Sequence, residues 1–482
     1  MITRMSVLAT ASTLTAAAAL AACGKPATES NSPASASASA AGSATGAAAG
    51  SGGAAAKKVS LKIVYLEAPP GHTLTDLFKA AKVQYETANP GSTEVLEPIN
   101  ATETAFYTKL ALMQRSSSTA PDLVYEDSFQ VNADATAGFL QPLDGYVGTW
   151  ADWSQYGTSV RAEGTGLDGK LYAIPLETDV QVIWYNKRVF AKAGLPTTWQ
   201  PTSWADILSA ARAVKKLPGV TPINIYATKA EGEATTLRGV ENLLAGTAGS
   251  LDATLYSHQS GKWMSGSKGM LDALTFLHTA YQEKMLPSTS SMEDPNLSNA
   301  VNNVMFPTGK LAMMVDGNWV SGSWGKTGSN PWGTWRSDVG VAALPTQDGA
   351  GAKRTSMSGG WTLAISSRSQ NKDAAWELLK LINSRANNLA YVLASSNIPL
   401  RNDVISDAAY SGSAPGAAFF AQLLKGTNYR PALTAYPQVS ELIMKAAESV
   451  TVGNTAPATA QATYDSALSS TVGADKVGQA SA

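Results

Sequence analysis

Strand patterns and helix patterns alternate along the chain from about residue 57 onward, and this order constrains the fold more than any other feature. Residues 59–66 begin as a half-buried strand, and apolar residues recur at helical spacing over 74–85. A second helix pattern over 106–113 leads into a short buried strand at 121–125. This order predicts an α/β fold with βαβ units in a doubly wound sheet rather than a sandwich.

The alternation continues toward the C-terminus. Ser203 and Asp206 have the spacing of a capping box before an apolar helix pattern over 204–214. We expect further strands at 180–185, 339–344 and 362–366, and further helices over 271–281, 374–382 and 442–450. After Thr455 the chain thins to Ala, Thr and Ser, so we expect this tail to fray.

Length, charge and cysteine content exclude several classes of protein. The 482 residues suffice for two or three compact units. With 36 Lys and Arg against 37 Asp and Glu, the chain lacks the basic excess that nucleic-acid binding requires. A single cysteine excludes an internal disulfide, a Cys-rich zinc site and an iron–sulfur cluster. The 12 Trp and 16 Tyr stand out instead, since their flat faces suit polar ligands with apolar faces.

The N-terminus has the features of an export signal. Arg4 supplies a positive end, residues 5–22 form an apolar stretch, and Leu20-Ala21-Ala22-Cys23 resembles a bacterial lipobox. We therefore expect a signal peptide over 1–22 and acylation of Cys23. The mature protein would be exported and lipid-anchored to the outer face of the bacterial cytoplasmic membrane. Residues 23–58, rich in Ala, Ser and Gly, would form a disordered tether.

Catalytic motifs fail when their structural context is checked. The G-x-G-x-x-G match at 164–169 precedes a strand-like segment that ends in proline, whereas a nucleotide site needs a helix there. The S-x-x-K matches at 265–268 and 323–326 are common in a chain rich in Ser and Gly. His72, His258 and His278 lack metal-ligand spacing. The sequence therefore predicts no catalytic residue, cofactor or metal, although a paired-carboxylate glycosidase needs no local motif.

Several short segments occur in a characteristic order over most of residues 59–450. They are Pro121-Asp122-Leu123-Val124-Tyr125, Gly138-Phe139-Leu140-Gln141-Pro142-Leu143-Asp144, Asp168-Gly169-Lys170-Leu171-Tyr172-Ala173-Ile174-Pro175, Trp184-Tyr185-Asn186-Lys187-Arg188-Val189-Phe190, Pro201-Thr202-Ser203-Trp204, Phe306-Pro307-Thr308-Gly309-Lys310-Leu311-Ala312-Met313, Gly317-Asn318-Trp319, Val341-Ala342-Ala343-Leu344-Pro345 and Gly359-Gly360-Trp361. Together they resemble the family 1 extracellular solute-binding proteins, the maltose/trehalose-type sugar-binding lipoproteins of ABC importers.

The resemblance implies a two-lobe, hinge-closing fold of the periplasmic-binding-protein type, with a central sheet in each lobe. Lobe one would comprise residues 59–178 and 355–404, lobe two 179–343 and 405–470, and 471–482 a frayed tail. A sugar would bind in the cleft at the strand C-termini, and the membrane permease would recognise the closed form. The family also implies a monomer without catalytic chemistry or nucleic-acid partner.

The resemblance places acidic ligand-binding residues at three points. Asp127 follows the 121–125 strand, with Glu126 as the alternative. Asp179 occupies the first crossing between lobes, with Glu177 as the alternative. Glu233, or else Glu231 or Arg238, faces the cleft. Glu67, at the end of the first strand, is a further candidate from the topology.

Aromatic residues would stack on the sugar faces. Trp319, after Gly317-Asn318, and Trp361, after Gly359 and Gly360, are the expected platforms, and Arg401 resembles an arginine that some disaccharide binders use. Tyr429 and Tyr436 fall in the region of another aromatic.

We expect a neutral di- or trisaccharide as ligand, because the candidate residues are mostly acidic and aromatic. Two alternatives stay open at this point. One is a binding protein of the same fold for a glycerophosphodiester or polyamine, and the other is a secreted carbohydrate-active enzyme.

Overall fold

The computed structural model describes residues 58–67, 72–248, 250–351, 353–413 and 416–480. The signal peptide, the acylated Cys23 and the tether predicted before residue 58 lie outside these residues. The described residues form one compact unit, which contains two main sheets. This arrangement confirms the predicted α/β class with a central sheet in each of two lobes.

Sheet one has six strands in the order β15-β4-β14-β3-β1-β2. They are β1 (Ser60–Leu66), β2 (Thr93–Ile99), β3 (Leu123–Asp127), β4 (Ala173–Thr178), β14 (Gly360–Ile365) and β15 (Ile398–Pro399). Strand β1 runs parallel to β2 and β3, whereas β14 runs antiparallel to β3 and β4, and β15 antiparallel to β4. The strand expected at 121–125 instead runs from Leu123 to Asp127.

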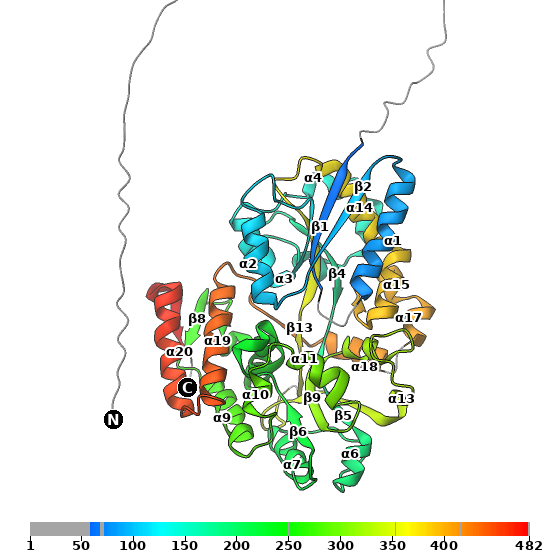
Figure 1. Ribbon diagram of the computed structural model, residues 1–482. Coiled ribbons are helices and arrows are strands. Elements are labelled where there is room, and N and C mark those ends of the chain that lie inside the picture. Colours follow the sequence, from blue (N-terminus) through cyan, green and yellow to red (C-terminus); the bar gives the residue numbers. More distant parts are fainter. Residues whose placement is uncertain (1–57, 68–71, 249, 352, 414–415, 481–482) are drawn as a thin grey trace, which may run out of the picture. The chain divides into compact units, whose positions relative to one another are not determined.

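Both faces of sheet one are covered by helices, which explains the long apolar runs in its strands. Leu61, Ile63 and Tyr65 of β1 share a hydrophobic cluster with α1 (Thr73–Ala88), α14 (Lys372–Ile382) and α15 (Arg385–Ser395). Val64 points to the opposite cluster, with α2 (Glu103–Met113). Figure 1 shows α1 on one side of β1 and α2 on the other. Helix α3 (Ser128–Thr136) follows β3 directly.

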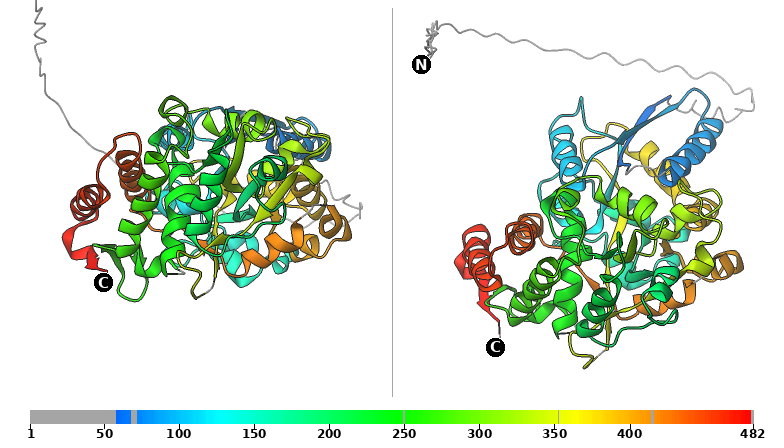
Figure 2. Two further views of the ribbon diagram at one scale, coloured as in Figure 1. Left: turned by 90° about the horizontal axis from the view of Figure 1, so that it is seen from below. Right: turned by 60° about the horizontal axis from the view of Figure 1, so that its bottom comes forward.

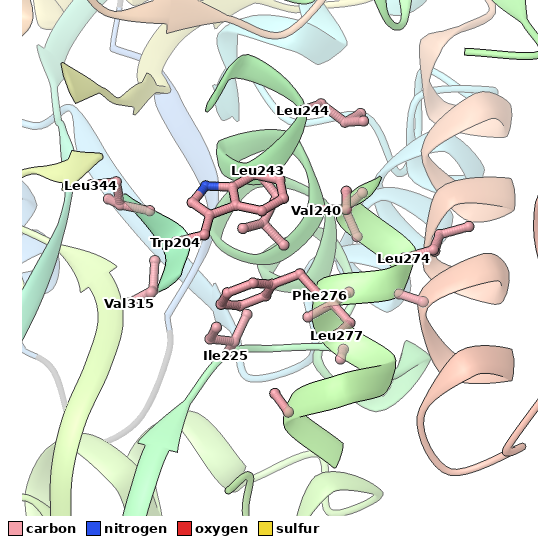
Figure 3. Packing of buried hydrophobic residues seen from close by; sticks show 14 of the residues in the cluster. Trp204, Ile225, Val240, Leu243, Leu244, Leu274, Phe276, Leu277, Val315 and Leu344 are labelled. Carbon is pink, nitrogen blue, oxygen red and sulfur yellow. The ribbon is translucent and has the colours of Figure 1, made fainter. Parts of the chain in front are cut away.

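Sheet two has four strands in the order β10-β5-β9-β6. They are β5 (Gln181–Asn186), β6 (Thr221–Asn224), β9 (Leu311–Gly317) and β10 (Val339–Ala342). The strands alternate between two clusters in the same way, because Ile183 and Tyr185 face one core while Val182 and Trp184 face the other. In the larger core, Trp204 and Phe276 pack edge to face with ring centroids 5.2 Å apart (Figure 3).

The helices of this second layer are α6 (Lys187–Lys192), α7 (Trp204–Val214), α8 (Asn242–Ala248), α9 (Lys268–Gln282), α19 (Tyr436–Val450) and α20 (Pro457–Val472). The predicted capping box of α7 is present, with Ser203 and Asp206 in reciprocal hydrogen bonds. Two further segments, η3 (Thr235–Glu241) and η5 (Val301–Met305), are π-helical. The sequence analysis does not predict these two segments.

Shorter elements complete the fold. The helices are α4 (Asp144–Val147), α5 (Thr158–Ala162), α10 (Thr289–Met292), α11 (Leu297–Ala300), α12 (Val320–Trp324), α13 (Trp335–Asp338), α16 (Asn402–Ile405), α17 (Ala408–Ser413) and α18 (Ala417–Leu424). The 3₁₀ turns are η1 (Ala151–Gln155), η2 (Lys229–Glu231), η4 (Leu251–Ala253) and η6 (Ala474–Lys476). The strands are β7 (Tyr256–Ser257), β8 (Lys262–Ser265), β11 (Leu344–Pro345), β12 (Arg354–Thr355), β13 (Met357–Ser358), β16 (Asn428–Tyr429) and β17 (Val477–Gln479).

The tail after Thr455 does not fray, which corrects the sequence prediction. Residues 457–472 form α20, which packs beside α19 and α9 (Figure 2). Tyr464 and Leu468 are buried in the larger core of sheet two, and β17 pairs in parallel with β8. Tertiary burial therefore stabilises a segment whose small residues suggested disorder.

The chain crosses between the two sheets at short segments. Only Asp179 and Val180 separate β4 of sheet one from β5 of sheet two. A second connection runs through β13 into β14, and a third through β16 toward α19. Strands β13 and β16 pair in parallel, so these two connections are hydrogen-bonded to each other.

Leu363, in the central strand β14, tests the importance of sheet one's core. Its side chain is fully buried, so Leu363→Ala removes apolar contacts and leaves a cavity. We expect a loss of about 2–5 kcal/mol in the free energy of unfolding, measured by urea denaturation. The control Val83→Ala, on an exposed position of α1, should change it by less than about 0.5 kcal/mol. Equal effects of the two substitutions would contradict this account of the core.

Candidate functional site

A cavity of about 740 Å³ lies where the strand ends of the two sheets meet. Asp127 ends β3, Glu177 is the second-last residue of β4, and Trp319 follows the end of β9; all three line the cavity. A volume of this size is typical of small-molecule sites. Of the ligand-binding residues predicted from the sequence, Asp127, Asp179, Glu233, Trp319 and Trp361 line it.

One wall is a row of three side chains across adjacent strands of sheet one. In register, Trp361 of β14 pairs with Asp127 of β3 on one side and with Glu177 of β4 on the other. The Trp361 ring stacks on Tyr125, with centroids 4.7 Å apart and an interplanar angle of 10°. The wall therefore presents an aromatic face between two carboxylates, and we call it the Asp127–Trp361–Glu177 row.

Glu126 and Asp127 lie on opposite faces of β3, which separates these two alternatives. Glu126 is fully buried near Asp134, away from the cavity, and burial raises its pKa well above the ordinary value. Asp127 lines the cavity and caps α3 by accepting a hydrogen bond from the Phe129 N–H at 3.3 Å. Asp127 is thus the residue of this pair that a ligand could reach.

Glu177 and Asp179 both line the cavity, so both alternatives stay candidates for ligand binding. Glu177 Oε1 accepts a hydrogen bond from the Tyr125 hydroxyl at 3.0 Å. Asp179 Oδ1 accepts hydrogen bonds from the Gly359 N–H at 3.1 Å and the Gln181 amide at 2.9 Å. The crossing segment is therefore tied to β14 through an acidic side chain.

The facing wall comes from sheet two. A Cβ at Gly317 would lie 1.9 Å from the Trp319 ring, so only glycine allows that ring to fold back over the end of β9. Arg238, on the π-helix η3, lies 5.7 Å from the Trp319 ring centroid and pairs with Asp316 at 2.9 Å. The Trp319 ring is thus held beside a guanidinium whose charge Asp316 neutralises.

Glu231 and Glu233 also both line the cavity. Glu231 accepts hydrogen bonds from the N–H and hydroxyl of Ser298, at 3.3 and 2.5 Å. Glu233 accepts a hydrogen bond from the Ser440 hydroxyl and pairs with Arg430 at 3.4 Å.

Arg430 is the main residue of this site that the sequence analysis missed. Its Nη2 lies 2.5 Å from Asp127 Oδ2, and its guanidinium lies 4.4 Å from the Phe129 ring centroid. Together with Glu233 these contacts join β3, the segment before η3, and the connection after β16. The only signal in the sequence is an arginine directly after the Asn428–Tyr429 strand, and no spacing rule marks it as a site residue.

The structure does not bring the remaining candidates to the cavity. Arg401 is buried elsewhere in the layer of sheet one, where it pairs with Asp403 at 2.8 Å and Asp152 at 3.0 Å, so we remove it from the candidate site. Glu67 accepts a hydrogen bond from Thr75 at 2.7 Å and is not among the described lining residues, although its neighbour Leu66 is. Gly360 contributes close packing only: a Cβ there would lie 2.8 Å from the Glu177 carbonyl.

Tyr429 and Tyr436 are likewise not among the lining residues. Tyr429 is 44% exposed on β16, and the buried Tyr436 donates a hydrogen bond to Glu241 at 2.9 Å.

Burial perturbs the acidic groups of the cavity. It raises the pKa of Glu103 and Glu177 to about 8, and that of Asp179 to about 6. The nearby charge of Asp127 acts in the same direction on all three groups. Among the described residues, no group of three or more His, Cys, Asp or Glu side chains is arranged to hold a metal ion. Nor does any helix within the described ranges have the length and apolar character needed to cross a membrane.

Comparison with known proteins identifies the family. The family model of bacterial extracellular solute-binding proteins matches residues 67–389. A binding protein of Brucella abortus (strain 2308) is 23% identical over 399 residues, covering 79% of this chain and 86% of that protein. The mannitol-binding protein of Pseudomonas aeruginosa PAO1 is 27% identical over 359 residues, covering 72% and 78%.

Solved structures show the same two-lobe fold. An ABC transporter solute-binding protein of Thermotoga lettingae, bound to α-D-tagatose, superposes with a TM-score of 0.73 at 24% identity, covering 86% of this chain and all of that one. The maltose-bound MalE3 of T. maritima has a TM-score of 0.73 at 20% identity, covering 85% and 99%. The predicted fold type is thereby confirmed.

The buried carboxyls predict an unusual dependence of stability on pH. Burial raises the pKa of Glu94, Glu177 and Glu241 from 4.5 to about 8. Between these values the folded protein binds more protons than the unfolded chain, so the free energy of unfolding falls as pH rises. We expect a lower melting temperature at pH 8.5 than at pH about 5.5, measured by differential scanning calorimetry.

Replacing Glu94 and Glu241, the two carboxyls outside the cavity, should reduce the slope of melting temperature against pH. Glu94→Gln and Glu241→Gln remove groups that must ionise, whereas Glu377→Gln on the exposed surface of α14 should leave the slope unchanged. A melting temperature that rises over this range would show that the carboxyls are not buried in this way.

Proposed function

The chain belongs to the bacterial extracellular solute-binding protein family, and we propose that it captures an oligosaccharide for an ABC importer. The Asp127–Trp361–Glu177 row, with Trp319 across the cavity, carries this proposal. Carboxylates accept hydrogen bonds from sugar hydroxyls, and aromatic faces pack on the C–H faces of the ring. Relatives named for mannitol, α-D-tagatose and maltose support a carbohydrate or polyol as the class of ligand.

Members of an extracellular family act outside the cytoplasm, so the protein is exported. We further propose that Cys23 is acylated and anchors the protein to the outer face of the cytoplasmic membrane. The lipobox resemblance of residues 20–23 supports this. A diacylated cysteine would give stable attachment, whereas one acyl chain alone would not.

Lobe closure would couple binding to transport. We propose that residues 59–178 with 355–404 form lobe one, that 179–343 with 405–470 form lobe two, and that α20 adds to lobe two. A monomeric protein would close over the sugar about the crossings near Asp179, β13 and β16. The membrane permease would then distinguish the liganded state by a population shift.

A secreted glycosidase is the second candidate. A carboxyl such as Glu177, whose pKa burial raises to about 8, is a feature of a general acid. However, Asp127 and Glu233 both already contact Arg430, so neither carboxyl group is free to act as the nucleophile or base that a glycosidase needs beside its acid. Binding without hydrolysis fits this pairing better.

A ligand screen tests both functions. A disaccharide of about 23 heavy atoms at roughly −0.3 kcal/mol per atom should bind with about −7 kcal/mol, or a Kd on the order of 10 μM. We expect at least one of trehalose, maltose, cellobiose, xylobiose and raffinose to raise the melting temperature and to be recovered intact by chromatography. Release of monosaccharide would identify an enzyme, and no shift with any carbohydrate or polyol would reject the proposal.

Trp361 is the residue whose loss should affect binding most selectively. Trp361→Ala removes the stacking face but leaves both neighbouring carboxylates, so we expect affinity for the bound sugar to fall about tenfold or more by calorimetry. Trp332→Ala, which removes a partly buried tryptophan outside the cavity, serves as control. Unchanged affinity in a folded Trp361→Ala protein would remove this residue from the site.

A further inference from the structure

The cavity has many more acidic than basic side chains. Seven carboxyl groups line it: Asp76, Glu103, Asp127, Glu177, Asp179, Glu231 and Glu233. Two guanidiniums face them, and lysine is absent from the described lining. Asp316, which lies outside that lining, already neutralises Arg238. Within the described lining, Arg430 forms direct ion pairs with two of the seven acids, Asp127 and Glu233.

A neutral ligand would leave the remaining acids without a cationic partner. Hydroxyl groups can donate hydrogen bonds to carboxylates, but they do not cancel a buried charge. Closure over a neutral molecule would remove water from several acids at once, and each ionised group without a partner opposes that step. A ligand with a positive charge would remove the penalty and replace water with an ion pair.

Glu177 marks where such a charge would sit. It is 3% exposed, it lines the cavity, and its Oε2 has no hydrogen-bond partner among the described residues. Trp361 is its register partner on β14, and Tyr125 and Tyr391 line the cavity nearby. Aromatic faces beside a carboxylate attract ammonium groups through the ring quadrupole as well as through the charge.

We propose that the ligand carries a basic nitrogen, and that Glu177, Asp179 and Trp361 bind it as a protonated amine. This inference rests on the proposed function, and it narrows the ligand to an amino-substituted carbohydrate. It also replaces the expectation of a neutral sugar, which was drawn from the residue types without their positions. Asp127 and Glu233, already paired with Arg430, would be left to the hydroxyls.

Proton release gives a signature of this binding mode. Burial raises the pKa of Glu177 and Asp179, and the nearby acids Asp127 and Glu163 act in the same direction. The hydroxyls of Tyr125 and Tyr391 lower the pKa of Glu177, and the Arg430 guanidinium lowers that of Asp179. A bound cation favours the ionised carboxylates. Binding of an amine should therefore release protons into the solution at pH 7, whereas binding of a neutral sugar should not.

Matched sugars that differ by one or more amines test the proposal. The probes are glucosamine with glucose, 2-amino-trehalose with trehalose, and the free-amine chitosan disaccharide with cellobiose. Spermidine tests an amine without a sugar. Calorimetry of the exported chain at pH 7, in two buffers of different ionisation heat, measures both affinity and protons released. We expect at least one amino sugar to bind about tenfold or more tightly than its neutral partner, with proton release.

Isosteric variants locate the subsite. Glu177→Gln cannot ionise, so it should remove most of the amine preference and the proton release while neutral sugars still bind. Asp179→Asn provides a second variant should the first fail to fold, as judged by circular dichroism. Glu377→Gln, the same change on an exposed position of α14, should retain the full preference.

The outcomes separate this inference from the proposed function. Neutral sugars that bind as tightly as their amino partners would overturn the inference and leave the proposed function intact. Spermidine binding without binding of any sugar would support amine recognition and reject carbohydrate as the ligand. Absence of binding by every probe would overturn both.

Discussion

The buried guanidinium of Arg430 holds the site together. It is 5% exposed and contacts Asp127 at the end of β3, Glu233 before η3, and the face of Phe129. Removing one partner from such a group leaves an unpaired buried charge, at a cost of about 3–5 kcal/mol. The three backbone segments are therefore constrained together, because each carboxylate is compatible with burial only while the guanidinium stays in place. The positions of the neighbouring strand ends depend on this pairing.

That pairing divides the acids of the cavity into two kinds. Asp127 and Glu233 pair directly with the Arg430 guanidinium. Among the described residues, the hydrogen bonds to Glu177 and Asp179 come from neutral donors, and burial raises the pKa of both groups. A network that is only partly satisfied is costly in a low-dielectric interior. A cationic ligand can therefore favour ionisation of the second kind and supply the charged partner that the described residues do not give it.

The strands and their terminal acids could be predicted, because apolar periodicity reports local burial and strand ends of a doubly wound sheet meet at one edge. The positions of Arg401 and Arg430 relative to the site could not be predicted. Arg401 looked like a ligand contact, but it pairs with Asp152 and Asp403 instead. Arg430 had no distinguishing neighbours in the sequence, and it pairs with residues 197 and 303 positions away. Helix α20 was missed although its buried residues recur every four positions, because small side chains weaken the apolar pattern.

Affinity in such a cavity depends on which groups gain a new binding partner from the ligand, not on how many groups the ligand contacts. A sugar hydroxyl that approaches Asp127 competes with the Arg430 guanidinium, and a neutral donor gains little from a carboxylate that already has a charged partner. At Glu177 the balance is reversed, since Oε2, which has no hydrogen-bond partner in the described part of the chain, gains one beside the Trp361 face. The same row of side chains can thus orient a sugar weakly at one end and bind a charged substituent strongly at the other. Selectivity then follows from the position of one carboxylate relative to one aromatic ring.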